Sequence, residues 1–368
     1  MKRFTVFPCM VIALLISVPS IAAPPLGLPP LPIPADNPQT PEKIALGEKL
    51  FNDKRFSSTG DVNCATCHKK EMAFTDQLPV SEGINKLTGT RNAPTVINAA
   101  YMQTQFWDGR EPSLEEQAGQ PPINPVEMGL ADYAPILRIV RTDPEYTKLF
   151  KKAFGKSGEQ ITMKEVKQAI ASFERTVIAG DSPFDRYQYG GDKTAMNAAA
   201  IRGLEIFRGQ GRCVSCHVIE QTQALFTDNR FHNIGVGFLT LADKESRVAK
   251  ELLESKRKGI SVDVQVLTKK NTSELGRFAI SETLQDMSAF KTSTLRNIDK
   301  TAPYMHDGSQ KTLEDVVKFY NNGGRLEKTD PLSPFLDGGM RPLNLTKEQE
   351  ADLVQFLKAL TSPEFAQQ

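Results

Sequence analysis

Two short motifs combine residue types that can do redox chemistry. Each has two cysteines separated by two residues, with a histidine directly after the second cysteine. This C-x-x-C-H spacing is the attachment signature of a c-type haem. Two thiols three positions apart on a helical turn can each form a thioether to one haem edge, and the adjacent histidine can then bind the iron as proximal ligand. The residues are Cys64, Cys67 and His68 in the first motif, and Cys213, Cys216 and His217 in the second.

Two other chemistries also use paired cysteines. A redox dithiol needs no histidine at the next position, and a zinc site with four cysteine ligands would leave both motif histidines unexplained. The chain contains only four histidines, so finding two of them directly after cysteine pairs favours haem attachment. The motifs therefore predict two covalently bound haem c groups.

The sixth ligand of each iron separates an electron carrier from an enzyme. A carrier usually saturates both irons with histidine or methionine, whereas an enzyme leaves one iron open to small molecules. Outside the motifs the only histidines are His232 and His306. Either one can bind iron or can form hydrogen bonds with haem propionates or loops, and composition does not choose between these roles.

The composition is that of a globular protein. The 368 residues are 39% hydrophobic and 24% charged, which excludes disordered and collagen-like chains. Lysine and arginine number 45 against 44 aspartate and glutamate residues, so no basic surplus indicates nucleic-acid binding.

Residues 1–22 have the pattern of a cleavable signal peptide. Lys2 and Arg3 precede an apolar run that ends in small residues and is too short to span a membrane. We expect cleavage after Ala22, with a membrane anchor as the alternative interpretation. No other stretch reaches membrane-spanning length, so we expect an exported protein with no stable membrane insertion.

The elements that must position the two motifs are mostly helices. One helix is expected to start with Thr40 as N-cap and Pro41 in the first position. Another starts with a capping box formed by Thr346 and Gln349. Apolar residues spaced by three and four predict further helices around residues 136–140, 166–177 and 201–207.

The expected fold is mainly α, with two cytochrome c-like helical haem domains and little β structure. The N-terminal domain is expected to cover residues 23–185 and the C-terminal domain residues 186–368. Both halves contain a helix followed by a cysteine pair, which is consistent with an old duplication. Alternating valines in 262–266 form the only candidate strand, and the Gly-, Asp- and Tyr-rich segment 180–192 suits a linker.

Longer stretches resemble the bacterial dihaem cytochrome c peroxidase and MauG family. The matching segments are residues 91–96, 105–110, 116–118 and 124–129 in the first half, and 231–235, 294–297 and 301–308 in the second. The resemblance runs in order from about residue 41 to residue 360. It implies a periplasmic peroxidase-type oxidoreductase that uses H2O2.

The resemblance also implies roles for individual residues. The haem at the first motif would react with peroxide, with Glu127 as its acid–base carboxylate and Gln117 as the neighbouring amide. A carboxylate beside an open iron can take a proton from H2O2 and return it to the leaving oxygen. Trp107 matches the aromatic residue that lies between the two haems.

A calcium site between the haems is implied in the same way. It would use Asn92 together with the backbone carbonyls of Thr301 and Pro303. Oxygen ligands suit a hard cation, although three protein oxygens require waters to complete the shell.

Two positions depart from the typical family pattern. Typical members carry a displaceable distal histidine sixteen residues after His68, and this chain has Ile84 there. They carry a methionine ligand of the second haem fourteen residues after His306, and this chain has Tyr320 there. An isoleucine cannot bind iron, and a phenolate stabilises ferric and higher iron.

Both departures resemble the MauG-like branch. In that branch a bis-Fe(IV) state oxidises residues such as Trp in a partner protein by long-range electron transfer. A surface tryptophan that serves electron transfer in the maturase is replaced here by Gly211, which leaves the protein substrate open. The alternative is a cytochrome c peroxidase that takes electrons from a small cytochrome c or cupredoxin. A plain electron carrier is a third hypothesis, against which Glu127, Gln117 and the missing distal ligand argue.

Overall fold

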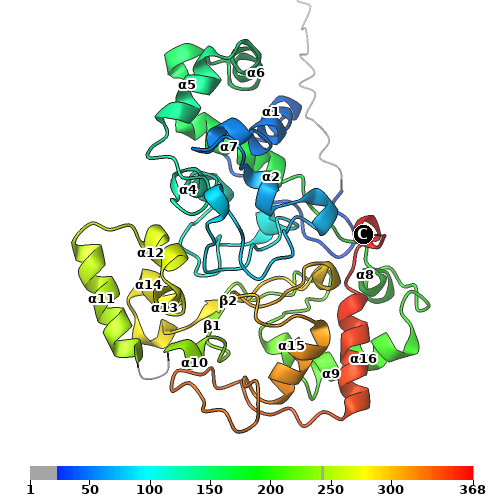
Figure 1. The fold of residues 1–368 in the computed structure, drawn as a ribbon. Coiled ribbons are helices and arrows are strands. Elements are labelled where there is room, and N and C mark those ends of the chain that lie inside the picture. Colours follow the sequence, from blue (N-terminus) through cyan, green and yellow to red (C-terminus); the bar gives the residue numbers. More distant parts are fainter. Residues whose placement is uncertain (1–22, 242–243, 368) are drawn as a thin grey trace, which may run out of the picture.

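The computed structural model describes residues 23–241 and 244–367, and the expected signal peptide lies outside these ranges (Figure 1). The predicted mainly helical fold is confirmed. The α-helices of the first half are α1 (Pro41–Phe51), α2 (Cys64–Cys67), α3 (Leu114–Gln117), α4 (Gln120–Ile123), α5 (Ala134–Thr142), α6 (Pro144–Phe154) and α7 (Met163–Glu174). Those that follow are α8 (Pro183–Gln188), α9 (Ala198–Arg208), α10 (Phe238–Leu241), α11 (Glu245–Arg257), α12 (Val262–Thr268), α13 (Lys270–Ser273), α14 (Phe278–Ser281), α15 (Leu313–Asn321) and α16 (Lys347–Lys358).

Strand structure is limited to one short pair in the part of the chain that is described. β1 (Phe231–His232) and β2 (Phe290–Lys291) run antiparallel, with Phe231 opposite Lys291. Short 3-10 helices fill several loops, among them η4 (Ala99–Tyr101), η6 (Cys213–Ser215) and η9 (Ile298–Lys300).

Both helix starts that the sequence predicts are confirmed. The Thr40 side chain accepts a hydrogen bond from the Lys43 backbone at 3.2 Å, with Pro41 in the first turn of α1. Thr346 accepts from the Gln349 backbone at 3.2 Å, and the Gln349 side chain accepts in return from the Thr346 backbone at 2.9 Å. Each cap satisfies backbone N–H groups that have no partner inside the helix.

Each half is built on the same pair of packed helices, α1 with α7 and α9 with α16 (Figure 1). A Cβ atom added to Gly47 of α1 would lie 1.9 Å from the carbonyl oxygen of Ala169. The same addition at Gly203 of α9 would lie 2.1 Å from the carbonyl oxygen of Asp352. Both helix pairs therefore need a glycine at their closest approach, which supports the predicted duplication.

The two halves also repeat a loop. Asn98 and Asn297 adopt left-handed backbone conformations, with φ of 62° and 60°, and each starts a 3-10 helix. An asparagine tolerates this conformation better than most residues do. Seven positions after each asparagine, the chain forms an isolated antiparallel β-bridge. The bridge joins Gln105 to Glu111 in the first half and Tyr304 to Gln310 in the second. Counting from the two asparagines places Trp107 and His306 at equivalent positions.

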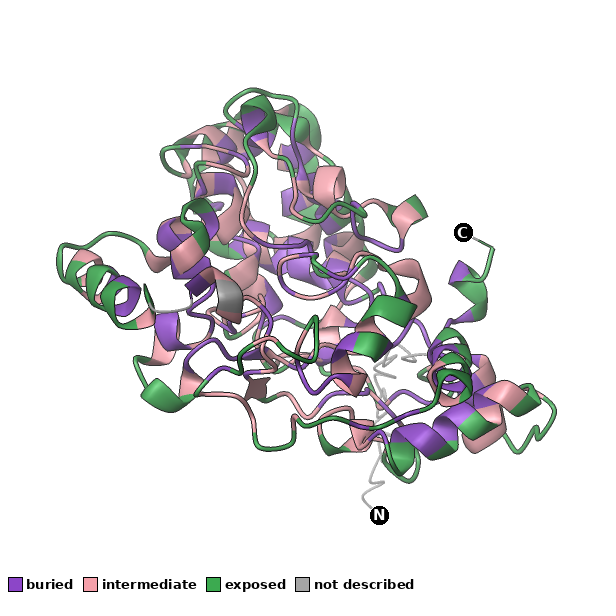
Figure 2. Ribbon diagram, turned by 60° about the horizontal axis from the view of Figure 1, so that its bottom comes forward, coloured by how far each residue is buried: buried purple, intermediate pink, exposed green. Residues whose placement is uncertain are grey.

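Three hydrophobic clusters fill the interior, and buried residues follow the inner faces of the helices (Figure 2). The first cluster belongs to α1, α5, α6 and α7, and the second to α9, α15 and α16. The third lies among α10 to α14 and is a separate lobe of the second half. Val126 of the first half packs against this lobe, so the lobe reaches across to the other half.

Two local predictions are wrong. The segment 262–266 forms helix α12, because Val262 and Val266 lie four residues apart and both pack in the third cluster. The segment 180–192 holds helix α8, which Ser182 caps, and Phe184 within it is fully buried in the second cluster. The composition of neither segment indicates that some of its side chains pack in a hydrophobic cluster.

The chain ends connect the two halves. The Arg296 guanidinium pairs with Asp185 at 2.8 Å and donates to the carbonyl oxygen of Gly27 at 2.7 Å, with both charged side chains fully buried. Near the other end, Phe365 packs in the first cluster. Over the described ranges, the chain has no helix that is long and apolar enough to cross a membrane.

Candidate active site

The first C-x-x-C-H motif forms a single helical turn, α2. Asn63 precedes this turn, and its backbone N–H donates to Thr66 Oγ1 at 3.0 Å. His68 follows, and its Nδ1 donates to the Phe74 carbonyl oxygen at 3.2 Å. Such a bond fixes the ring and leaves Nε2 as the ligand atom. Burial lowers the pKa of His68, which favours the neutral ring that metals bind.

The second motif repeats this arrangement. His217 Nδ1 donates to the Phe226 carbonyl oxygen at 2.8 Å, and burial lowers the pKa of this histidine as well. The His217 ring lies 6.5 Å from that of Phe207 at 45°, and the His68 ring lies 6.4 Å from that of Phe51 at 45°. Both motifs thus present a histidine in the same orientation to the helix that precedes it.

The four cysteines of the two motifs are not paired with one another. Cys64, Cys67, Cys213 and Cys216 form no disulfide. Burial raises the pKa of Cys64 above its usual range and that of Cys67 and Cys213 to about 12. Redox dithiols and zinc ligands act as thiolates. A haem thioether carries no charge, so the burial of these sulphurs is compatible with covalent haem attachment.

A large cavity extends from the second motif to the junction between the halves. It is lined by Cys213, Cys216, His217, Tyr320, Trp107, Asn92, Thr301 and Pro303, among other residues. Apolar side chains such as Phe207, Val317 and Leu357 form part of its wall. Two thiols, an oriented imidazole and an apolar wall in one cavity fit a covalently attached haem.

Tyr320 lies on α15 and lines this cavity together with His217. Burial, followed by the nearby Cys213 and Cys216 sulphurs, raises the pKa of Tyr320 above its usual range. The phenol is therefore neutral unless a cation compensates for its charge. The arrangement is compatible with the expected ligand role of Tyr320.

Glu127 lies at the end of a tight turn that begins at Asn124. Its backbone N–H donates to the Asn124 carbonyl oxygen at 3.2 Å, and its carboxyl Oε2 is buried with no hydrogen-bond partner among the described residues. Burial and then the charge of Asp263 raise the pKa of Glu127 to about 8, while Arg110 opposes the shift. A carboxyl group that titrates near neutral pH can both take and return a proton.

Ile84 lies directly beside this turn. Its backbone N–H donates to the Glu127 carbonyl oxygen at 2.9 Å, and its side chain is buried in the first hydrophobic cluster. Gly83 allows this contact, because a Cβ there would lie 2.1 Å from the Val126 carbonyl oxygen. The position that holds a histidine in typical family members is thus an aliphatic part of the core.

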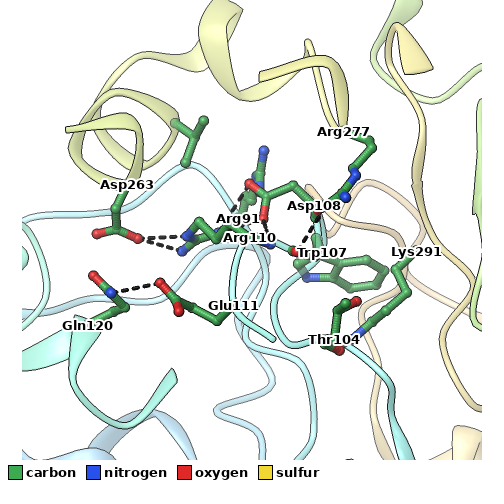
Figure 3. A network of polar contacts seen from close by, with 12 residues as sticks. Arg91, Thr104, Trp107, Asp108, Arg110, Glu111, Gln120, Asp263, Arg277 and Lys291 are labelled. Carbon is green, nitrogen blue, oxygen red and sulfur yellow. Dashed lines mark hydrogen bonds and ion pairs between the residues drawn. The ribbon is translucent and has the colours of Figure 1, made fainter. Parts of the chain in front are cut away.

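An ion-pair network connects Asp108 and Arg110 of the first half to α12 of the third-cluster lobe (Figure 3). Arg110 pairs with Asp263 of α12 at 2.7 Å and with Asp108 at 3.0 Å. Asp263 also accepts a short hydrogen bond from the Asn124 amide, whose own oxygen accepts from the Val126 backbone at 3.0 Å. The second half therefore helps to hold the turn that carries Glu127.

Trp107 lies at the junction between the halves. Its indole Nε1 donates to the Asn92 carbonyl oxygen at 2.9 Å, and its own carbonyl oxygen accepts from the Lys291 backbone at 2.8 Å. Asn92, Thr301 and Pro303 line the same cavity as this indole. The Asn92 amide nitrogen donates to the Leu78 carbonyl oxygen at 2.8 Å, which leaves Oδ1 as an acceptor for a cation.

Gln117 ends helix α3 and is half-buried. Within the described ranges its side-chain amide forms no hydrogen bond with Glu127, so the structure does not bring these two expected partners together through a direct bond. The neighbouring Gln120 donates instead to Glu111 at 2.7 Å.

The two remaining histidines are held by carboxylates. His232 has Asp337 2.7 Å from Nδ1 and Asp228 2.8 Å from Nε2. His306 is buried, with Nε2 2.8 Å from Glu274 and its ring stacked 3.6 Å from that of Phe290. These contacts favour the loop-bonding role over iron ligation for both residues.

Comparisons with known proteins agree with this geometry. Residues 41–194 match a family model described as di-haem cytochrome c peroxidase. The chain is 36% identical over 338 residues to the cytochrome-c peroxidase IdrP1 of Denitromonas iodatirespirans, covering 90% of this chain and 85% of that protein. It is also 36% identical over 329 residues to the methylamine utilization protein MauG of Methylorubrum extorquens, covering 89% and 81%. The chain belongs to the di-haem cytochrome c peroxidase family.

A solved structure from this family has the same fold. The crystal structure of a MauG-like protein associated with microbial copper homeostasis aligns with a TM-score of 0.75 and 33% identity, covering 93% of this chain and 97% of that one. Family membership implies two haem c groups and a peroxidase-type oxidoreductase that acts on peroxide. The relatives include both a MauG and a cytochrome c peroxidase, so they do not choose between the two activities.

Sequence analysis missed two residues of this dihaem centre. Asp263 lies in the segment that was expected to be a strand, and no local pattern connects it with Glu127. Lys291 stands at the position equivalent to Asn92, six residues before the asparagine of the repeated loop. Both loops contain an Asp-Gly pair, at 108–109 and 307–308. Aligning the two loops on these pairs would have placed Lys291 opposite Asn92.

Proposed function

We propose that this enzyme is of the MauG-like type, using H2O2 to oxidise residues of a partner protein by long-range electron transfer. The observation that carries the proposal is the placement of Tyr320 in one cavity with His217 and both cysteines of the second motif. An anionic oxygen ligand stabilises ferric and higher iron, whereas a methionine ligand favours the ferrous state that electron uptake requires. Ile84 supports the same proposal, because it leaves the first iron open without prior reduction.

Glu127 is the proposed acid–base residue at the first haem. The haem, when bound, would supply the redox chemistry that reduces peroxide and stores the oxidising equivalents. Glu127 takes a proton from the bound peroxide and returns it to the leaving oxygen. Its buried, unpartnered oxygen and its pKa of about 8 suit this exchange near neutral pH.

Trp107 is the proposed connection between the two haems. This residue lies at the junction of the halves. Its indole Nε1 and its backbone carbonyl each form one of the hydrogen bonds that hold it there. Asn92, Thr301 and Pro303 are proposed to hold a calcium ion next to it. We also propose the cleavable signal peptide, the periplasmic location and two haem domains, with the limit between the domains placed before α8 because Phe184 of this helix packs in the second cluster.

The test compares the wild-type holoprotein with Tyr320→His and Tyr320→Met. After one equivalent of H2O2, the wild type is expected to keep an oxidised state at both haems that decays slowly without a donor. Mass spectrometry is expected to find oxidised tryptophan or tyrosine in a protein encoded beside its gene. Both variants are expected to stay low-spin at the second haem and to lose this protein oxidation. Rapid turnover of reduced cytochrome c by the wild type, with no protein modified, would refute the proposal.

A cytochrome c peroxidase is the second candidate. The similarity to IdrP1, at 36% identity over 90% of this chain, favours it. In that case electrons from a small cytochrome c or cupredoxin would reduce H2O2 to water. The same experiment separates the two, because this candidate predicts fast oxidation of added cytochrome c.

A further inference from the structure

Two equivalent hydrogen bonds join the halves at their junction. The Asn92 backbone N–H donates to the His306 carbonyl oxygen at 2.8 Å, and the Lys291 backbone N–H donates to the Trp107 carbonyl oxygen at 2.8 Å. Asn92 and Lys291 each stand six residues before the left-handed asparagine of the repeated loop, and Trp107 and His306 each stand nine residues after it. The junction therefore has a local two-fold symmetry that exchanges these pairs.

The two equivalent positions carry different chemistry. Asn92 offers a neutral oxygen and lines the same cavity as Thr301 and Pro303, with which it would form the proposed calcium site. Lys291 instead offers an ammonium group, and its Nζ donates to the carbonyl oxygen of Thr104 at 2.6 Å (Figure 3). Thr104 stands six residues after its asparagine, as Pro303 does after its own. The ammonium thus bonds the carbonyl whose counterpart is a proposed metal ligand.

Burial and a nearby carboxylate act in opposite directions on the pKa of the Lys291 ammonium. Burial lowers the pKa of Lys291 to about 8, and the nearby Asp108 carboxylate opposes this shift. The Asp108 carboxylate is itself shared by Arg91 at 2.6 Å and Arg110 at 3.0 Å. Lys291 therefore contributes one more positive charge to a junction that is already rich in charged groups.

We infer that the Lys291 ammonium is a built-in cation that takes the place of a metal ion at the second of two equivalent sites. One site would need calcium from solution, and the other is filled by the chain itself. An ammonium donates well to backbone carbonyls, which are also the ligands that calcium prefers. Trp107 bonds Asn92 through its indole N–H and Lys291 through its backbone carbonyl, so this residue connects the two sites. This inference rests on the calcium site of the proposed function, but it does not depend on the partner protein.

The direct test is the calcium content of the holoprotein. Lys291→Asn gives the second site the side chain of the first, so we expect one additional Ca2+ per chain after dialysis against Ca2+ and removal of free ion. Lys291→Met removes the same charge without adding an oxygen and is expected to bind no additional ion. Equal calcium content in the wild type and in folded Lys291→Asn, with haem spectra unchanged, would overturn the inference.

A second measurement remains decisive if Lys291→Asn does not fold. A nearby positive charge stabilises reduced iron, so Lys291→Met is expected to shift the midpoint potential of at least one haem downward in a spectroelectrochemical titration. Lys291→Arg keeps the charge and serves as the control with little shift. Potentials in Lys291→Met that match the wild type would show that this position supplies no cation. Neither readout involves peroxide, so failure here is distinct from failure of the proposed function.

Discussion

At the scale of single residues, Glu127 and Glu174 show how burial of a carboxyl group serves two different ends. Glu127 lies beside the expected peroxide site, with Asp263 and Arg110 acting on its charge. Glu174 lies at the end of α7, where its Oε2 is buried with no hydrogen-bond partner in the described ranges. The first is the proposed proton-exchange group for the substrate, whereas the burial of the second makes the stability of the fold sensitive to pH.

Glu127→Gln is expected to slow the reaction with H2O2 by about two to four orders of magnitude, the usual contribution of general acid–base catalysis. In the wild type the rate is expected to rise with pH up to an inflection near 8, because the ionised carboxylate accepts the proton. Stopped-flow measurements across pH test both statements. Glu116→Gln, at an exposed carboxylate paired with Lys167, is the control. A wild-type profile without an inflection, or an unchanged rate in Glu127→Gln, would contradict this role.

Glu174→Leu is expected to stabilise the protein at pH 8 more than at pH 5. Burial raises the pKa of Glu174 to about 8 from 4.5, with Arg175 opposing the shift. The native state therefore keeps a proton that the unfolded chain releases, and wild-type stability falls as the pH rises from about 4.5 to about 8. The gain at pH 8 is expected to be on the order of 3 kcal/mol. Leucine is suitable because Leu357 stands at the equivalent position of α16.

Denaturant midpoints at the two pH values measure this gain. Glu159→Gln, at an exposed position, is expected to change neither midpoint. A Glu174→Leu protein whose stability falls with pH as steeply as that of the wild type would show that another group causes the fall.

At the scale of elements, α12 and the Asn124–Glu127 turn form one functional unit although they belong to different halves. Asp263 of α12 bonds the Asn124 amide and pairs with Arg110. The turn is therefore held from outside as well as by its own backbone bonds. This arrangement makes Asp263 a positioning residue for Glu127.

Asp263→Asn is expected to move the pH inflection of the peroxide reaction below that of the wild type. The charge of Asp263 raises the pKa of Glu127, so its removal lets the carboxyl ionise at lower pH. Asp263→Ala also removes the acceptor of the Asn124 amide and is expected to lower the maximal rate. Stopped-flow pH profiles distinguish the two effects. An inflection that stays in place in both variants would mean that Asp263 has only a structural role.

At the scale of the whole molecule, the buried Arg296 guanidinium joins the leading segment, α8 and the loop that ends at Ala224. It pairs with Asp185 at 2.8 Å and donates to the carbonyl oxygens of Gly27 at 2.7 Å and Ala224 at 2.6 Å. Gly27 has a φ of 83°, and a Cβ there would lie 1.9 Å from the Asp185 carboxylate. The segment around Gly27 thus packs with the second half, although it precedes the helices of the first half in the sequence.

Arg296→Met is expected to lower the free energy of unfolding by about 3–5 kcal/mol, because it leaves the Asp185 charge buried and unpaired. The double variant Arg296→Met with Asp185→Leu removes both charges and is expected to recover a large part of this loss. Denaturant unfolding followed by far-ultraviolet circular dichroism measures the difference. A double variant that is no more stable than the single one would show that the bonds to Gly27 and Ala224 dominate instead.

Local patterns in the chain predicted the two haem-attachment motifs and several of the helices. The C-x-x-C-H spacing, the Thr40 and Thr346 caps and the apolar periodicity of α1, α7 and α9 all depend on neighbours within a few residues, and the structure confirms the helices they predicted. The resemblance to the peroxidase family, carried by longer segments, is confirmed as well. The expected roles of Glu127, Trp107 and Tyr320 stay predictions with compatible geometry.

Contacts between segments that are distant in the sequence could not be predicted from those local patterns. Val262 to Val266 alternate as in a strand, yet they form a helix because their burial is set by the third cluster and not by their neighbours in sequence. The pairing of Asp263 with Arg110, across 153 positions, and of Lys291 with Thr104, across 187, depends on how the two halves dock. Such pairs arise only when tertiary packing removes both partners from water, since a buried charge must then be compensated by whichever group the fold brings near.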